Sequence, residues 1–100
     1  MPHYYFAIAS KKFLVDAEPI EEILRERTNH YTTTNKHIDF WFTLNPKFIY
    51  LPELKYIETK FKKPAAAIVS LDQEFIEWLK LRIGFVTVGN FESESLDQLI

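Results

Sequence analysis

The segment from Ile38 to Leu44 places the strongest constraint on the fold, because its side chains alternate as they do in a β-strand. Successive side chains of a strand point to opposite faces. Four apolar side chains therefore share one face, which we expect to belong to the core: Ile38, Phe40, Phe42 and Leu44. The other face carries Asp39, Trp41 and Thr43, and a carboxylate beside a tryptophan is unusual for a solvated surface. The rest of the chain has to explain what these side chains contact.

Similar patterns predict three more strands and three helices. The strands are expected at residues 4–10, 65–70 and 85–91. Residues 65–70 form an unbroken apolar run, which is typical of an inner strand buried on both faces. The helices are expected at residues 18–31, 52–63 and 73–83. The first opens at Glu18-Pro19, and the third has Asp72 as its N-cap and Gly84 as its C-terminal stop.

Each predicted helix carries an apolar stripe at helical spacing. The stripes are Ile20, Ile23, Leu24 and Tyr31, then Leu54, Ile57 and Phe61, then Phe75, Ile76, Leu79 and Ile83. Arg27 interrupts the first stripe. Its stem can cover apolar surface, or its guanidinium can pair with a carboxylate on the sheet, for which Asp39 is the first candidate.

The order of elements, β-α-β-α-β-α-β, indicates a single four-stranded sheet with helices packed on it. Alternation by itself favours parallel crossovers, although an antiparallel or mixed sheet gives the same order in an α+β fold. The 100 residues leave no room for a second core. We expect one domain over residues 1–92, followed by a short acidic and mobile tail over residues 93–100.

Composition disfavours several functional classes. The net charge is −2 and the twelve Lys and Arg residues are scattered, which argues against nucleic-acid binding. The chain has no cysteine, so disulfides, thiolate metal sites and cysteine nucleophiles are excluded. No apolar run approaches the roughly 20 residues of a transmembrane helix. Residues 1–5 lack the charged start of a targeting peptide, so we expect none there.

The polar side chains offer no convincing catalytic site. His37 and Asp39 share a strand face, which suits a bound metal or an acid–base pair, but no third ligand lies nearby in the sequence. Glu21, Glu22 and Glu26 lack the Glu-x-x-His spacing of a di-iron carboxylate site. We therefore expect a protein that is not an enzyme and that holds no metal or cofactor of its own.

The third predicted helix carries an aromatic–arginine pair instead. Trp78 and Arg82 are one turn apart beside the apolar stripe, and these residue types are enriched at the centres of protein interfaces. Leu81 points away from the stripe and adds to this surface. Simpler interpretations stay open, because Arg82 also suits a helix C-terminus. Likewise, Trp41 packs under a helix if both sheet faces are covered, and Asp39 can simply pair with a cation.

Four groups of residues carry a family resemblance. They are Tyr4-Tyr5 with Ala9-Ser10-x-Lys12-Phe13-Leu14, Glu18-Pro19-x-Glu21-Glu22-x-Leu24-Arg25-Glu26-Arg27, Ile38-Asp39-Phe40-Trp41, and Phe75-Ile76-x-Trp78-Leu79-Lys80-Leu81-Arg82. In order and spacing they resemble the small accessory subunit of the magnesium-protoporphyrin IX monomethyl ester oxidative cyclase, found in cyanobacteria and plastids. The resemblance runs from about Tyr4 to Phe91.

The resemblance implies an α+β fold with one four-stranded, mostly antiparallel sheet and about three flanking helices. It implies a non-catalytic accessory or assembly subunit that binds the membrane-associated di-iron cyclase, which forms the isocyclic ring of chlorophyll and supplies protochlorophyllide. The expected location is the cyanobacterial cytoplasm or the plastid stroma, at the thylakoid membrane through the partner. The resemblance also makes Asp39, Phe40 and Arg82 functionally important, with Trp41 adjoining. Alternation places Phe40 in the core, whereas the resemblance makes it functionally important. Both are met if a buried Phe40 holds Asp39 in place.

Three hypotheses follow. In the first, five side chains form a surface that binds the catalytic cyclase subunit: Asp39, Phe40, Trp41, Trp78 and Arg82. The alternative is a small-molecule module in which Arg27 and Arg82 bind propionates of the porphyrin substrate, because an arginine fork matches a carboxylate. The third and least favoured is a stand-alone enzyme that uses His37 and Asp39 as an acid–base pair.

Overall fold

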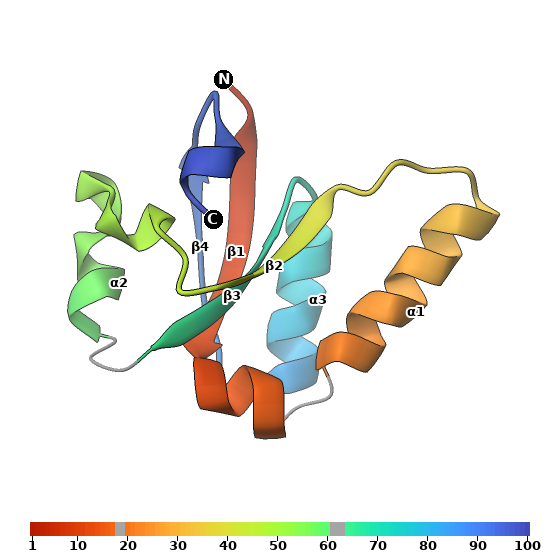
Figure 1. The fold of residues 1–100 in the computed structure, drawn as a ribbon, viewed down its shortest axis with the longest axis horizontal. Helices are drawn as coiled ribbons and strands as arrows, with labels where there is room; N and C mark the ends of the chain where they lie inside the picture. Colours follow the sequence, from red (N-terminus) through yellow and green to blue (C-terminus); the bar gives the residue numbers. More distant parts are fainter. Residues whose placement is uncertain (18–19, 61–63) are drawn as a thin grey trace.

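Four strands form one sheet in the computed structural model of the chain (Figure 1). They are β1 (His3–Ser10), β2 (Phe40–Leu44), β3 (Ala65–Ser70) and β4 (Thr87–Glu92). The structure describes residues 1–17, 20–60 and 64–100. The predicted helix start at Glu18-Pro19 and the predicted stripe residue Phe61 therefore lie outside the described residues.

The strands lie in the order β2-β3-β1-β4, and every neighbouring pair is antiparallel. The helix α1 (Ile20–Thr33) carries the chain from β1 to β2, and β3 lies between these two strands. The helix α3 (Gln73–Ile83) likewise joins β3 to β4, with β1 between them. Two interlocked β-α-β units explain how helices and strands alternate along the chain while neighbouring strands run antiparallel. The α+β fold is confirmed, and the parallel arrangement that alternation alone favours is wrong.

Both faces of the sheet are covered. On one face, which we call the α3 face, lie α1, α3 and a short π-helical turn, η1 (Phe13–Ala17). On the other, the α2 face, the segment between β2 and β3 forms two 3-10 turns, η2 (Phe48–Tyr50) and η3 (Pro52–Leu54), and then α2 (Lys55–Lys60). A last 3-10 turn, η4 (Leu96–Gln98), packs on the same α2 face. Figure 1 shows α2 on one side of the strands and α1 and α3 on the other.

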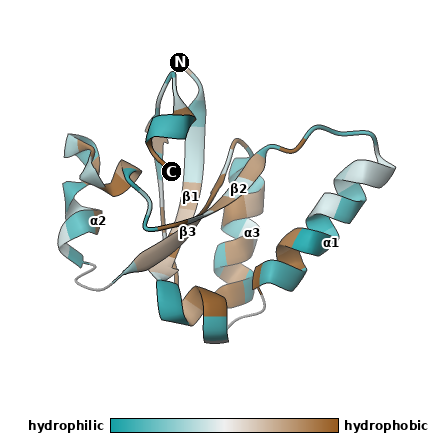
Figure 2. Ribbon diagram, in the orientation of Figure 1, coloured by the Kyte–Doolittle hydropathy of each residue, from teal (hydrophilic) through white to brown (hydrophobic). Residues whose placement is uncertain are grey.

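Each face buries its own hydrophobic cluster, because the central strands alternate. Tyr4, Phe6 and Ile8 of β1 belong to the cluster on the α2 face, whereas Ala7 and Ala9 belong to the cluster on the α3 face. These small side chains let α3 lie close to β1. Every residue of β3 is buried, which confirms the predicted inner strand. Figure 2 shows hydrophobic residues concentrated in the sheet and α3, and becoming fewer along α1 toward its C-terminal end.

The edge strand β2 departs most from the prediction. It begins at Phe40 rather than Ile38. Of the four side chains expected in the core, only Phe40 is buried, whereas Ile38, Phe42 and Leu44 are 46%, 38% and 46% exposed. The core-face prediction is therefore wrong for these three side chains. The reason is that β2 lies at the edge of the sheet, where the helices cover only part of it. The ring of Tyr31 on α1 contacts Phe40, whereas Phe42 borders an open groove.

The opposite side of β2 is the better buried one. Thr43 is 8% exposed, and the half-buried Trp41 packs against the cluster on the α2 face. The Trp41 ring meets the ring of Tyr4 edge to face, with 6.2 Å between the centroids. Because both faces of the sheet are covered, Trp41 takes part in the packing of that face.

Residues 93–100, which we expected to be a mobile tail, are docked in the structure. Leu96 is buried on the α2 face, and Leu99 and Ile100 pack against the same cluster. The carbonyl of Leu99 accepts hydrogen bonds from the main-chain N–H groups of Lys47 and Phe48, each 2.9 Å long. The structure thus shows residues 93–100 in a docked position. Their mobility stays a prediction.

Candidate functional site

Asp39 lies just before β2 and is held through its side chain and its backbone. One carboxylate oxygen accepts a 2.8 Å hydrogen bond from the hydroxyl of Tyr31. The other lies 3.9 Å from Nζ of Lys36. The main-chain carbonyl accepts hydrogen bonds from the N–H of Leu71 and the hydroxyl of Ser70, both 3.0 Å long. The carboxylate is thereby fixed, and its side chain is still 20% exposed.

Tyr31 connects Asp39 to α1. Its residue is 2% exposed, and its hydroxyl accepts a 2.6 Å hydrogen bond from Arg27 while donating to Asp39. Burial raises the pKa of the Tyr31 phenol, and the hydrogen bond to Asp39 raises it further. The neutral phenol is therefore the favoured form, and it keeps the proton that it donates to the carboxylate.

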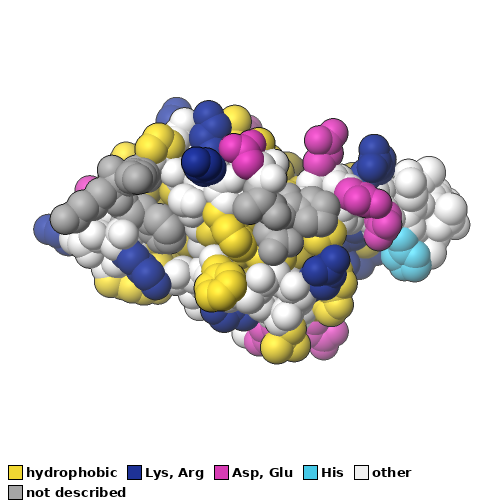
Figure 3. Space-filling view, turned by 90° about the horizontal axis from the view of Figure 1, so that it is seen from below, with side chains coloured by type: hydrophobic (Ala, Val, Ile, Leu, Met, Phe, Trp, Pro, Cys, Tyr) yellow, Lys and Arg dark blue, Asp and Glu magenta, His cyan; other side chains and the backbone are white. Residues whose placement is uncertain are grey.

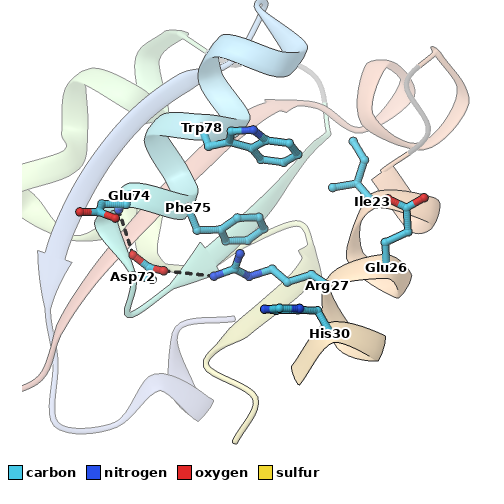
Figure 4. Close-up of a pocket in the computed structure, with 8 residues that line it drawn as sticks. All are labelled: Ile23, Glu26, Arg27, His30, Asp72, Glu74, Phe75 and Trp78. Atoms are coloured by element: carbon cyan, nitrogen blue, oxygen red, sulfur yellow. Dashed lines mark hydrogen bonds and ion pairs between the residues drawn. The ribbon is translucent and has the colours of Figure 1, made fainter. Parts of the chain in front are cut away.

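Arg27 lies at the centre of the arrangement. Its guanidinium pairs with Asp72 at 3.1 Å and lies 3.7 Å from the centroid of the Phe75 ring, at cation–π distance. In Figure 4 the side chain reaches from α1 to Asp72 and passes between the rings of Phe75 and His30. Its Nε atom is buried and has no hydrogen-bond partner among the described residues. Pairing with the sheet carboxylate Asp39 was one of the two interpretations of Arg27, but the ion-pair partner is Asp72, and Tyr31 bridges Arg27 and Asp39.

Asp72 joins this arrangement to the start of α3. It is the N-cap of that helix, as predicted, because one carboxylate oxygen accepts a 3.0 Å hydrogen bond from the N–H of Glu74. Its second oxygen receives Arg27, so each oxygen has its own partner. Its own N–H donates to the hydroxyl of Ser70, which in turn donates to the carbonyl of Asp39. Three segments that are distant in the sequence are thus held in one position.

Aromatic rings fill the space around the guanidinium. Phe40 is 6% exposed and meets Tyr31 and Phe75 edge to face, at centroid distances of 5.5 and 5.7 Å. Trp78 stacks on Phe75 with 6.2 Å between the centroids and is 49% exposed. Seven residues form this connected group, which we call the Arg27 cluster: Arg27, Tyr31, Asp39, Phe40, Asp72, Phe75 and Trp78.

Three of the five residues predicted for a partner surface belong to the Arg27 cluster, and two do not. Asp39, Phe40 and Trp78 are connected through it. Trp41 lies on the opposite face of the sheet, so the single surface that we expected to join it to Trp78 does not form. Arg82 follows Trp78 by one turn and is exposed. Within the described residues, no hydrogen bond or ion pair reaches its side chain.

Sequence reasoning identified Leu81, which is 86% exposed on α3, but missed Phe85, which is 84% exposed just after that helix. Phe85 was predicted as a strand residue, but β4 begins only at Thr87. Tyr31 and Phe75 were recognised as stripe residues, and only their three-dimensional neighbours show that they hold polar groups.

A pocket of about 430 Å³ opens between α1 and α3 (Figure 4). It is lined by Ile23, Glu26, Arg27, His30, Asp72, Glu74, Phe75 and Trp78. Its walls carry both signs of charge, and Arg27 and Asp72 already form an ion pair with one another. In the described part of the chain, no group of three or more His, Cys, Asp and Glu side chains is placed to hold a metal ion. Nor is any helix there long and apolar enough to span a bilayer.

Comparison with known proteins gives consistent matches. The family model described as "Ycf54 protein" matches residues 2–93. "Uncharacterized protein ycf54" of Pyropia yezoensis is 50% identical over 92 residues, which cover 92% of this chain and 83% of that protein. "Protein YCF54, chloroplastic" of Arabidopsis thaliana is 35% identical over 98 residues, 97% of this chain and 46% of that protein. The solved structure of the Ycf54 protein from Synechocystis has a TM-score of 0.91 at 45% identity, covering 95% of this chain and 89% of that one.

Proposed function

The chain belongs to the Ycf54 family, and on this premise we propose that it is a non-catalytic accessory subunit of the di-iron magnesium-protoporphyrin IX monomethyl ester cyclase. In this role it binds the membrane-associated catalytic subunit and supports formation of the isocyclic ring of chlorophyll. The matched proteins come from a red alga, a cyanobacterium and a plant chloroplast. A place in the cyanobacterial cytoplasm or plastid stroma, at the thylakoid membrane through its partner, fits that distribution.

The Arg27 cluster is the observation that carries this proposal. Its charged and polar groups are mostly paired with one another, which suits a fixed binding surface better than proton transfer or covalent chemistry. Held in this way, the surface loses little conformational freedom when a partner binds. Trp78 is the one member of the cluster that is classed as exposed, and tryptophan is among the residue types that dominate binding energy at protein interfaces.

Each site residue has a distinct part in the proposed interface. One carboxylate oxygen of Asp39 accepts the hydrogen bond from Tyr31, and the other is offered to a cation of the partner. Trp78 and Arg82 supply an exposed ring and an exposed cation on the outer side of α3. Phe40 acts indirectly, because it is buried and packs against the Tyr31 ring that orients Asp39. Trp41 would contribute from the α2 face.

A pull-down from a chlorophyll-synthesising membrane extract tests the proposal. The wild-type chain should co-purify with the catalytic subunit, and Arg82→Ala should lose it without a change in thermal midpoint, because the Arg82 side chain is exposed. Arg25→Ala is the matched control, since Arg25 is an exposed arginine on α1. Undiminished co-purification of Arg82→Ala would show that this part of α3 is not the interface.

A second candidate is a module that binds the porphyrin substrate. The pocket between α1 and α3 favours it, because Trp78 and Phe75 offer apolar rings beside Arg27. Arg27 is already paired with Asp72, however, so it would have to exchange a carboxylate inside the protein for one on the ligand. Titration with the pigment while Trp fluorescence is recorded separates the two candidates. Absence of saturable quenching at micromolar pigment would dismiss the pigment site.

A further inference from the structure

The free edge of β2 exposes main-chain hydrogen-bonding groups. Asp39 accepts from Leu71, and Asn45 donates to Ala65, so these residues make the main-chain bonds to β3. Hydrogen-bonded and non-bonded pairs alternate along antiparallel strands. The register therefore turns the N–H groups of Phe42 and Leu44 away from β3, toward the open edge of the sheet. No main-chain partner reaches them within residues 1–17, 20–60 and 64–100.

An apolar groove lies directly beside this edge. It measures about 310 Å³ and is lined by Leu14, Val15, Ile20, Glu21, Leu24 and Phe42. Val15 is 51% exposed and Phe42 is 38% exposed, so the apolar wall is open to solvent. A residue paired with Phe42 on an added strand would point its side chain to the same face as Phe42, toward the groove. The edge and the groove therefore select an extended segment with a large apolar side chain at that position.

The other edge of the sheet lacks this combination. The edge strand β4 contains Gly89 and Asn90 in its centre and ends in Glu92, which lies 3.4 Å from the ring of His3. Proteins protect edge strands from unwanted pairing with charged, irregular or poorly strand-forming residues. Residues 40–44 of β2 include neither a charged residue nor a proline. An unprotected apolar edge is expected where strand pairing is used.

Charge distinguishes between the possible occupants. Glu21 lines the groove, and Asp16 and Glu22, each of which follows a lining residue in the sequence, are exposed on η1 and α1. Figure 3, which views the molecule from below, shows acidic side chains on the α1 side, with Lys and Arg side chains among them. A second copy paired about a two-fold axis at Phe42 would bring the two Glu21 carboxylates toward each other. A segment that carries Lys or Arg beside its apolar residue would meet opposite charge instead.

We propose that β2 adds an extended segment of the partner subunit as a fifth strand, with an apolar side chain in the groove beside Phe42 and a flanking Lys or Arg near Glu21. This mode of recognition combines main-chain hydrogen bonds with pockets for alternate side chains. The inference rests on the proposed function, because the segment belongs to the subunit that the chain is proposed to assist. It adds a second contact region, which lies beyond the Arg27 cluster.

Substitution at Leu44 tests the added strand. Leu44→Pro removes an N–H that faces the open edge, where proline is tolerated, and leaves the bonds to β3 in place. Leu44→Thr is the control, because it changes the side chain but keeps the N–H. Co-purification of the partner subunit should fall roughly tenfold or more for Leu44→Pro, as expected for the loss of a main-chain hydrogen bond and blocked pairing. Leu44→Thr should stay close to wild type, and both variants should keep the thermal midpoint of the wild-type chain.

Amide hydrogen exchange gives an independent reading on the wild-type complex. In the free chain, the amides of Phe42 and Leu44 should exchange fast, whereas those of Trp41 and Thr43 are protected by β3. Binding of a strand should slow Phe42 and Leu44 strongly and change their neighbours little. This alternation separates strand addition from simple coverage of the surface.

Other outcomes overturn the inference in distinguishable ways. If the wild-type complex forms but the Phe42 and Leu44 amides stay fast, or Leu44→Pro binds as well as wild type, strand addition is wrong and the proposed function stands. If the chain alone forms a dimer that Leu44→Pro abolishes, the occupant is a second copy. If the wild-type chain does not co-purify with the catalytic subunit, the proposed function fails and this occupant fails with it.

Discussion

The two faces of the sheet are packed with different kinds of side chains. On the α2 face, Phe6, Phe48 and Phe91 pack ring against ring, with centroid distances of 4.7, 4.9 and 6.2 Å. On the α3 face, the hydrophobic cluster includes Tyr31 with its hydroxyl, and the ion pair of Arg27 with Asp72 lies against it at Phe75. One sheet thus separates a layer packed mainly from apolar side chains from a layer that includes a polar network.

This difference separates stability from recognition. Apolar packing stabilises the fold in proportion to the apolar area that it buries. It does not hold polar groups in fixed positions at the surface, where a partner could bind them. A buried polar network contributes less net stability, because desolvation offsets much of its attraction, but it fixes the positions of its members. We therefore expect substitutions on the α2 face to change mainly unfolding free energy, and substitutions in the Arg27 cluster to change binding as well.

The largest effect is expected for Phe48→Ala on the α2 face. Phe48 is fully buried between Phe6 and Phe91, and removing such a ring leaves a cavity that costs about 3–5 kcal/mol of unfolding free energy. Urea unfolding measures the loss, and Phe48→Leu serves as the milder control. Loss of less than about 1 kcal/mol would show that the face is not tightly packed.

Gly89→Ala tests the same face by adding volume. A Cβ at Gly89 would lie 2.5 Å from Cζ of the fully buried Phe6 ring, so the ring has to move. Overpacking of this kind costs about 1–3 kcal/mol. The double variant Gly89→Ala with Phe6→Leu should lose less than the sum of the two single changes. Additive losses would mean that the two positions do not compete for space.

Asp72→Ala tests the polar network on the α3 face. It removes a helix N-cap and the ion-pair partner of Arg27, which together cost about 2 kcal/mol. Asp72→Asn keeps a capping oxygen, so its loss of stability should be about half that of Asp72→Ala. Unlike Phe48→Ala, both variants should also weaken co-purification of the partner subunit when measured on folded protein. Unchanged binding would confine Asp72 to a structural role.

Tyr31→Phe should have the smallest effect on stability, about 1 kcal/mol at neutral pH, because only the hydroxyl and its hydrogen bonds are lost. Its diagnostic feature is the pH dependence. Burial raises the pKa of Tyr31 above its ordinary 10.0, so its contribution is complete below pH 10.0 and is lost as pH rises through the raised pKa. Urea unfolding in alkaline buffers should show a smaller decline for Tyr31→Phe than for wild type. Parallel declines would assign the alkaline loss to other groups.

Local signals sufficed for much of the fold. The apolar run of residues 65–70 gave β3 with its observed bounds, and Asp72 and Gly84 delimit α3 as expected. These features depend on neighbours within a few residues, so periodicity and capping chemistry predict them. The antiparallel direction of the strands came from the family resemblance, because alternation alone pointed to parallel strands, and the order of the strands in the sheet was not predicted.

The site was harder to predict because it depends on long-range neighbours. Alternation placed Phe42 in the core, but burial of an edge strand depends on which helix covers it, and that information is not local. Arg27 and Asp72 are 45 residues apart, so spacing could not identify them as a pair. Trp41 was assigned to the correct side of β2, opposite Phe40, yet that side turned out to face a different layer from Trp78.

The strand order also governs how the chain can fold. The central strand β1 is made first, but it pairs with residues 65–70 on one side and with residues 87–92 on the other. Contacts over such long separations require large loops to close, which slows folding relative to a fold with local pairings. During synthesis β1 therefore waits with both edges unpaired, and unpaired edges of this kind are where nascent chains aggregate. The sheet becomes complete only when β4 joins it, so the last strand in the sequence decides when the molecule becomes a stable binding partner.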